Sequence, residues 1–142
     1  MIFGTIVGQE MVLNRSGEWV AAEWLRSQEI RSEVQLDEFI VMPNHVHAIV
    51  LLLRADGKYL EWKPRAFRGS PARSISSLMQ GFKSSSTRRI NEARRTPGAA
   101  VWQRDYFERV LRSERELERA RAYILDNPRK WAEDKNNPAN AA

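Results

Sequence analysis

The chain contains two histidines, and a single residue separates them in the sequence His45-Val46-His47. The residues that follow, 47–53, are mostly apolar and partly β-branched, which is typical of a strand. Side chains alternate between the two faces of a strand, so the two imidazoles are expected on one face and Val46 on the other. Two neutral imidazoles side by side make up part of a divalent-metal site.

The last predicted helix offers the groups that could complete such a site. Tyr123 and Asn127 are four residues apart, so they share one face of that helix. A tyrosine hydroxyl can act as a nucleophile toward phosphorus, and an asparagine carbonyl oxygen can bind a hard cation. Taken alone, Tyr123 is more often an ordinary packed residue. Asp37 and Glu38 precede the histidine pair, and we interpret them as surface groups or outer partners of the site.

The hydrophobic pattern predicts the elements that position these residues. Strands and helices follow one another in an order that favours a small antiparallel sheet with helices on one side, an α+β sandwich. The last helix is then the natural element to close over the histidine face. The predicted elements are a hairpin within 3–13, a helix at 17–28, strands at 34–42 and 47–53, a helix through 75–90, a strand at 101–112 and a helix at 114–127 capped by Ser113 and Glu116.

Length and composition indicate one domain of ordinary hydrophobicity. The chain has 142 residues, a hydrophobic content of 42% and no cysteine, which excludes disulfides, thiolate metal sites and cysteine nucleophiles. We assign the domain to residues 1–131 and expect 132–142 to be a polar C-terminal tail that frays. With no long apolar run and no basic segment followed by an apolar one at the start, we expect a cytoplasmic protein without a membrane partner.

The positive charge is concentrated in the middle of the chain. Residues 54–95 hold 11 basic and 3 acidic side chains, whereas residues 1–53 hold 3 basic and 7 acidic ones. This asymmetry favours a nucleic-acid partner. The stretch 54–73 is expected to be a long exposed loop whose aromatics either stack on unpaired bases or pack against the core. The residues expected to bind nucleic acid are Lys58, Trp62, Lys63, Arg65, Arg68, Arg73, Lys83 and Arg88.

Three segments together resemble a known family. FIVMPNHVH at 39–47 resembles the histidine–hydrophobe–histidine signature of HUH single-strand endonucleases. WQRDYF at 102–107, followed by YILDNP at 123–128, resembles the C-terminal half of the REP-associated tyrosine transposases, which are relatives of the single-tyrosine transposases of small insertion sequences. The resemblance extends from about Phe3 to Trp131, which is nearly the whole chain.

This resemblance implies a fold, an activity and a set of roles. The fold would be a ferredoxin-like (RRM-like) antiparallel sheet with helices on one face. His45, His47 and Asn127 would bind Mg²⁺ or Mn²⁺, and Tyr123 would be the nucleophile. The activity would be cleavage and rejoining of single-stranded DNA near REP-like hairpins through a 5′-phosphotyrosine intermediate, by a monomer or a homodimer.

The chain departs from that family at its beginning, where relatives usually carry an extra strand before the hairpin at residue 3. Without this strand we expect a three-stranded central sheet with an exposed edge. The alternative function is a catalytically inactive nucleic-acid-binding module, truncated or domesticated, that retains the sheet and the basic loop. A small metallohydrolase is a weaker third hypothesis, because no further histidine, cysteine or nearby carboxylate triad completes its site.

Overall fold

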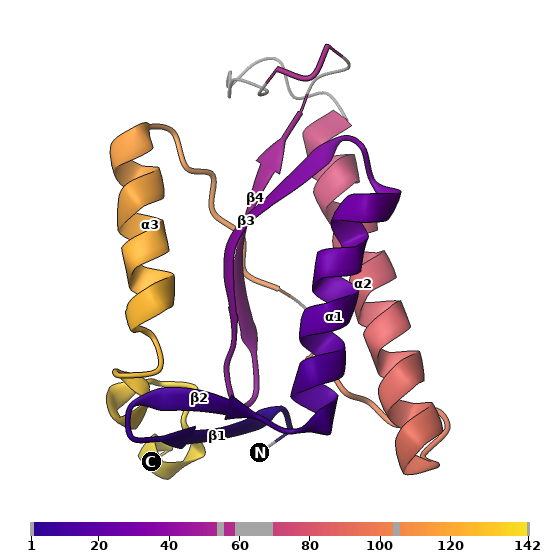
Figure 1. The fold of residues 1–142 in the computed structure, drawn as a ribbon, viewed down its shortest axis with the longest axis vertical. Helices are drawn as coiled ribbons and strands as arrows, with labels where there is room; N and C mark the ends of the chain where they lie inside the picture. Colours follow the sequence, from indigo (N-terminus) through magenta and orange to yellow (C-terminus); the bar gives the residue numbers. More distant parts are fainter. Residues whose placement is uncertain (1, 54–55, 59–69, 104–105, 142) are drawn as a thin grey trace.

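The computed structural model describes residues 2–53, 56–58, 70–103 and 106–141, which form an α+β fold compatible with the ferredoxin-like class (Figure 1). None of the helices in these described ranges is both long enough and apolar enough to cross a bilayer. The elements are β1 Gly4–Val7, β2 Glu10–Leu13, α1 Arg15–Ile30, β3 Val34–Val41, β4 Val46–Leu52, α2 Ser70–Arg94, α3 Glu114–Asp126 and the short 3₁₀ helices η1 Trp131–Glu133 and η2 Pro138–Asn140.

The strands form two antiparallel hairpins. In β1–β2 the turn residues Gly8 and Gln9 both have positive φ angles, 55° and 71°, as the tight turns that match strand twist require. In β3–β4 Ile40 lies opposite His47, and the pairing is irregular between Leu36 and Phe39. Both hairpins confirm the sequence prediction.

Helix α1 begins where the sequence predicts and is held against the first hairpin. The Asn14 side chain accepts a hydrogen bond from the Gly17 amide at 3.0 Å, which satisfies a free donor at the helix start. A Cβ atom on Gly17 would lie 2.1 Å from the Phe3 carbonyl oxygen. Only glycine therefore allows the chain to approach this closely.

The β3–β4 hairpin lies between two layers of helices. Helices α1 and α2 pack on one side of it, and α3 stands on the other side (Figure 1). Two helices therefore share one face, as expected, while α3 covers the opposite face. The main core belongs to the α1–α2 side, and its buried residues are Phe3, Val20, Trp24, Val34, Val41, Leu78, Phe82 and Ile90.

Helix α3 is attached to the hairpin by contacts of its own. Ile124 is its buried residue, 4% exposed, and does not belong to the α1–α2 core. The Arg121 guanidinium binds Asp37 of β3 with two parallel hydrogen bonds, the first 2.7 Å from Nε to Oδ1. At the start of the helix the Ser113 hydroxyl accepts a hydrogen bond from the Glu116 amide, which confirms the predicted cap.

The prediction of a strand at 101–112 is wrong. The described residues of this stretch, 101–103 and 106–112, pair with no other strand. Val101 and Trp102 at its beginning pack against the core, but the alternating pattern beyond them is exposed, and Phe107 is 94% exposed. A strand needs a hydrogen-bonded partner as well as a pattern. The central sheet in the described ranges therefore has two strands instead of three. Residues 70–73, expected in the loop, already belong to α2.

The C-terminal tail is ordered through residue 141 instead of frayed. Its asparagine side chains form hydrogen bonds to backbone carbonyls, which fix a short polar segment that has little apolar surface to bury. Asn137 donates to the Trp131 carbonyl at 3.0 Å, and Asn140 donates to the Ala132 carbonyl at 2.7 Å. These bonds hold η1 and η2 together at the base of α3 (Figure 1).

Candidate metal and nucleophile site

The two histidine side chains lie together on the face of the hairpin that α3 covers. His47 is the second residue of β4, and His45 comes directly before the strand. Their Nε2 atoms are 3.0 Å apart and their ring planes are nearly perpendicular, at 88°. The prediction that both imidazoles share one side of the strand is therefore confirmed, although His45 lies just outside the ladder.

Asn44 determines which nitrogen of His45 carries the proton. Its Nδ2 donates to the Asn136 carbonyl at 2.8 Å, so its Oδ1 is the atom that lies 2.8 Å from His45 Nδ1. An amide oxygen only accepts, so Nδ1 of His45 must be the donor. The neutral ring then keeps a lone pair on Nε2, facing His47, and this is the arrangement that metal-binding histidines usually adopt.

Both histidines are held in their neutral form. The pKa of His45 is lowered to about 4, chiefly by burial and also by the charge of neighbouring His47, while the Asp134 carboxylate opposes both effects. Burial also lowers the pKa of His47, again against Asp134. Neutral imidazoles are the form that binds cations. In this structure His47 Nε2 donates a hydrogen bond to His45 Nε2, so a bound ion would take the place of that hydrogen.

The donor set fits two adjacent ligands of one divalent ion. If both nitrogens bound an ion at about 2.1 Å, their separation of 3.0 Å would set an angle of roughly 90° at the ion, as neighbouring positions of an octahedron require. Among the described residues no group of three or more histidine, cysteine, aspartate or glutamate side chains could hold a metal. Any ion here would therefore take its other ligands from an amide, water or a substrate.

Tyr123 faces the histidines from α3, as predicted. Its ring meets the His47 ring edge to face, with centroids 5.6 Å apart and planes at 77°. The side chain is 53% exposed, so solvent and a large substrate both reach it. The Arg121–Asp37 pair, two residues earlier on the same helix, fixes α3 to β3 beside this contact.

The Asn127 side chain is bound to the backbone at the end of α3. It lies at the end of α3, 4% exposed, and its Nδ2 donates to the Tyr123 carbonyl at 2.7 Å. The amide thus satisfies a carbonyl that the helix end leaves free. No hydrogen bond within the described ranges joins Asn127 to either histidine, and its role as a metal ligand stays a prediction.

Three residues near the site were not identified from the sequence as part of it. Trp131 packs on the His45 ring with centroids 6.0 Å apart, Asp134 acts on the charge of both histidines, and Asn136 accepts the Asn44 bond. All three lie just beyond α3. The cluster of asparagines at 136–140 was the available signal, because such side chains cap and link backbone.

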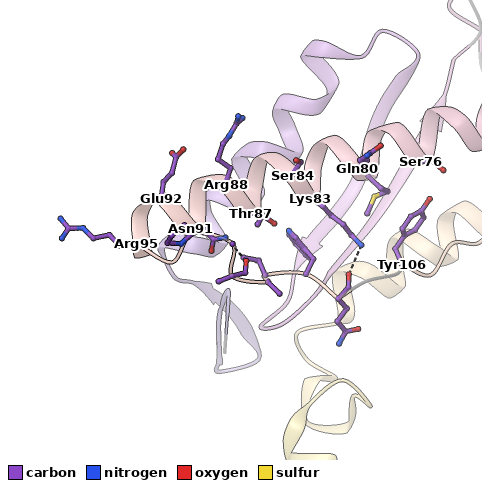
Figure 2. A pocket seen from close by; sticks show the side chains of 18 residues that line it. Ser76, Gln80, Lys83, Ser84, Thr87, Arg88, Asn91, Glu92, Arg95 and Tyr106 are labelled. Carbon is purple, nitrogen blue, oxygen red and sulfur yellow. Dashed lines mark hydrogen bonds between the residues drawn. The ribbon is translucent and has the colours of Figure 1, made fainter.

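The residues expected to bind nucleic acid divide into three groups. Lys58 and Arg88 are exposed, and Lys83 reaches from α2 to the Gln103 carbonyl at 3.2 Å (Figure 2). Arg73 lies in α2, although its side chain is outside the described part. Trp62, Lys63, Arg65 and Arg68 lie outside the described residues.

Comparison with known proteins gives one informative relative. The chain is 33% identical over 139 residues to an uncharacterized protein of Haemophilus influenzae, and the alignment covers 94% of this chain and 76% of that protein. No protein-family model matches the sequence. No solved structure matches it either.

Proposed function

The chain belongs to the family of this uncharacterized Haemophilus influenzae protein, and from its own site we propose that it is a metal-dependent single-stranded DNA endonuclease and transposase. It would cleave and rejoin DNA near hairpins through a 5′-phosphotyrosine intermediate, as the resemblance to the REP-associated tyrosine transposases implies. Tyr123 is the nucleophile of this proposal, and His45 and His47 are its metal ligands.

One observation carries the proposal. Two neutral imidazoles with Nε2 atoms 3.0 Å apart lie beside a half-exposed tyrosine whose ring contacts one of them. The two histidines are neighbours in the sequence, whereas Tyr123 comes from α3, far along the chain. A tyrosine next to a pair of metal-ligand histidines fits phosphoryl transfer better than hydrolysis by a metal site alone.

The reaction would exchange one phosphate ester for another. The Tyr123 oxygen forms a bond to phosphorus while the bond from phosphorus to the 3′ oxygen breaks, and the released 3′ oxygen takes up a proton. The phenol gives its proton to solvent, to which the half-exposed side chain is open. Because the new ester resembles the old one in energy, a second 3′ hydroxyl can reverse the step and reseal the strand without ATP.

His45, His47 and, as a third candidate, Asn127 would hold a divalent ion at the scissile phosphate. Such an ion supplies charge that stabilises the oxygens of the reacting phosphate. Asn44 keeps the lone pair of His45 Nε2 directed into the site. The Arg121–Asp37 pair holds α3, and with it Tyr123, against the β3–β4 hairpin.

The direct test is covalent capture of DNA. The protein is incubated with single-stranded hairpin DNA and Mn²⁺, then denatured and separated by size. We expect a protein–DNA band in the wild type and none in Tyr123→Phe, because phenylalanine keeps the ring contact with His47 but has no nucleophile. Leu125→Ala is the control on the same helix, since the Leu125 side chain is 65% exposed and has no nucleophile to lose.

Two results would contradict the proposal. A band of undiminished intensity in Tyr123→Phe would assign the linkage to another residue. A wild-type protein that forms no band with any hairpin, with Mn²⁺ or with Mg²⁺, would remove the catalytic assignment. His45→Ala and His47→Ala should each lower adduct formation while leaving the helical circular dichroism unchanged.

A catalytically inactive nucleic-acid-binding module is the second candidate. It is favoured by the small donor set, because no group of three or more histidine, cysteine, aspartate or glutamate side chains among the described residues could hold a metal. Nicking separates the two functions: a binding module retards single-stranded DNA in a gel but leaves it intact in Mn²⁺.

A further inference from the structure

A groove of about 930 Å³ runs along the side of α2, far in sequence from the histidine pair. One wall is the helix, and the other is formed by residues 97–103 of the segment that follows it, together with Tyr106 (Figure 2). Lys83 reaches across the groove to the other wall, whereas Arg88, Glu92 and Arg95 stand at its edge and extend away from the helix (Figure 2). No role in the site described above uses them.

The groove is built rigidly, because the segment is bound to α2 at three points. Asn91 donates to the Ala99 carbonyl at 2.8 Å, Trp102 donates its indole N–H to the buried Ser86 hydroxyl at 2.9 Å, and Lys83 donates to the Gln103 carbonyl. These bonds keep the two walls apart at a fixed spacing. A ligand would thus meet a preformed surface.

The charges at the groove are mostly positive. Lys83, Arg88 and Arg95 line it against one acid, Glu92. In Figure 2 the Arg88 and Arg95 side chains extend outward from the helix, and neither forms an ion pair with any residue in the described ranges.

Several other arginines are bound into the fold. Arg89 pairs with Glu23, Arg94 binds the Ser16 hydroxyl, and Arg121 pairs with Asp37. Arg88 and Arg95 differ from these arginines in forming no ion pair within the described ranges, which leaves their charges available to an anion.

The groove also offers an aromatic surface and enough length for several phosphates. The partly exposed Tyr106 ring lies at one end, with the Lys83 ammonium 5.5 Å from its centroid. From Gln80 to Arg94, its last residue, the helix rises roughly 21 Å, at 1.5 Å per residue. A groove that combines cations with an aromatic ring is typical of surfaces that bind single-stranded nucleic acid.

We propose that this groove binds a single-stranded nucleic-acid segment, with Arg88 and Arg95 on its phosphates and Tyr106 stacked on a base. This deepens the proposed function, on which it rests, by adding a binding surface away from the histidine site. A duplex would use only the cations, whereas an unpaired strand also uses the ring. A strand long enough to reach both sites would be held in the groove while it is cut.

The test measures binding of fluorescent oligodeoxythymidine to the full-length protein by anisotropy, across a range of salt concentrations. Arg88→Gln/Arg95→Gln should weaken binding about 10-fold and reduce the salt slope by roughly 1.4, since each phosphate contact on a single strand contributes about 0.7. Tyr106→Ala should weaken the single strand on the order of 10-fold and leave a duplex of equal length unaffected. Arg26→Gln/Arg115→Gln, two exposed arginines elsewhere, is the charge-matched control and should change neither quantity by as much.

Unchanged affinity and slope in the Arg88/Arg95 variant would overturn the proposal, as would equal losses in the Arg26/Arg115 control. Equal loss for the duplex and the single strand in Tyr106→Ala would overturn the choice of an unpaired strand. The covalent assay separates this proposal from the proposed function. If the wild type forms no adduct but the groove variants still weaken binding, the groove stands without the catalysis; if an adduct forms and these variants bind normally, the catalysis stands without the groove.

Discussion

The ion pair between Asp37 and Arg121 should contribute measurably to the attachment of α3. Asp37→Asn keeps the size of the side chain and removes its charge. Two charge-assisted hydrogen bonds would each be worth up to about 2 kcal/mol in a dry setting, but Arg121 is 40% exposed, so solvent screens the pair. We expect the free energy of unfolding at pH 7 to fall by about 1–2 kcal/mol.

The effect should depend on pH in a defined direction. The hydrogen bond from Arg121 holds the pKa of Asp37 below its ordinary value of 3.8, despite some burial. A carboxyl group with a depressed pKa in the folded state stabilises the fold above its unfolded pKa, and this contribution is lost as the pH falls through the folded value. The difference between wild type and Asp37→Asn should therefore be constant above about pH 5 and shrink below pH 3.8.

The assay is urea denaturation of wild type, Asp37→Asn, Arg121→Gln and the double variant, at several pH values. The double-mutant cycle should give a coupling energy of about 1 kcal/mol at pH 7. A coupling energy of zero, or a destabilisation of Asp37→Asn that persists unchanged at low pH, would refute the assignment of this pair as the tie between α3 and β3.

Four other predictions test separate parts of the structure. Asn44→Ala removes the acceptor of the His45 Nδ1 proton, so Mn²⁺ affinity measured by calorimetry should fall by roughly 10-fold; an unchanged affinity would show that the bond does not orient the ring. In metal-free protein the His45 ring should titrate near pH 4 by NMR, and a midpoint near that of a free histidine would contradict its burial. Ile124→Ala should lower the free energy of unfolding by about 2–4 kcal/mol, because it empties a buried site beneath α3. Gly17→Ala should destabilise by more than about 2 kcal/mol, since its new Cβ would overlap the Phe3 carbonyl; a normal melting temperature would rule out that close approach.

Local patterns predicted the pieces that depend on local physics. The 3.6-residue spacing of Leu78, Phe82 and Ile90 identified the buried face of α2, because apolar residues that recur once per helical turn lie on one side of the helix. The Ser113 cap and the His45–His47 arrangement followed from short-range rules in the same way. These features need only a few neighbouring residues to be defined.

Features that depend on distant partners were not predictable. The alternation around Phe107 matches a strand, yet pairing requires an adjacent edge that the pattern does not specify. The tail resembled a frayed terminus because it is polar, and its order comes from asparagine side chains bonded to backbone several residues away. Asn127 shares a helix face with Tyr123 as expected, but its Nδ2 donates a hydrogen bond to the Tyr123 carbonyl at the end of the helix.

The separation of α3 from the main core has a consequence for local unfolding. The cluster around Trp24 and Phe82 contains no residue of α3, which depends on Ile124 and the Asp37–Arg121 pair. Elements held by few buried contacts open with lower free energy than the whole protein does. Amide hydrogens of α3 should therefore exchange before those of α1 and α2, and Tyr123 belongs to a unit that can detach and return while the histidine strand stays folded.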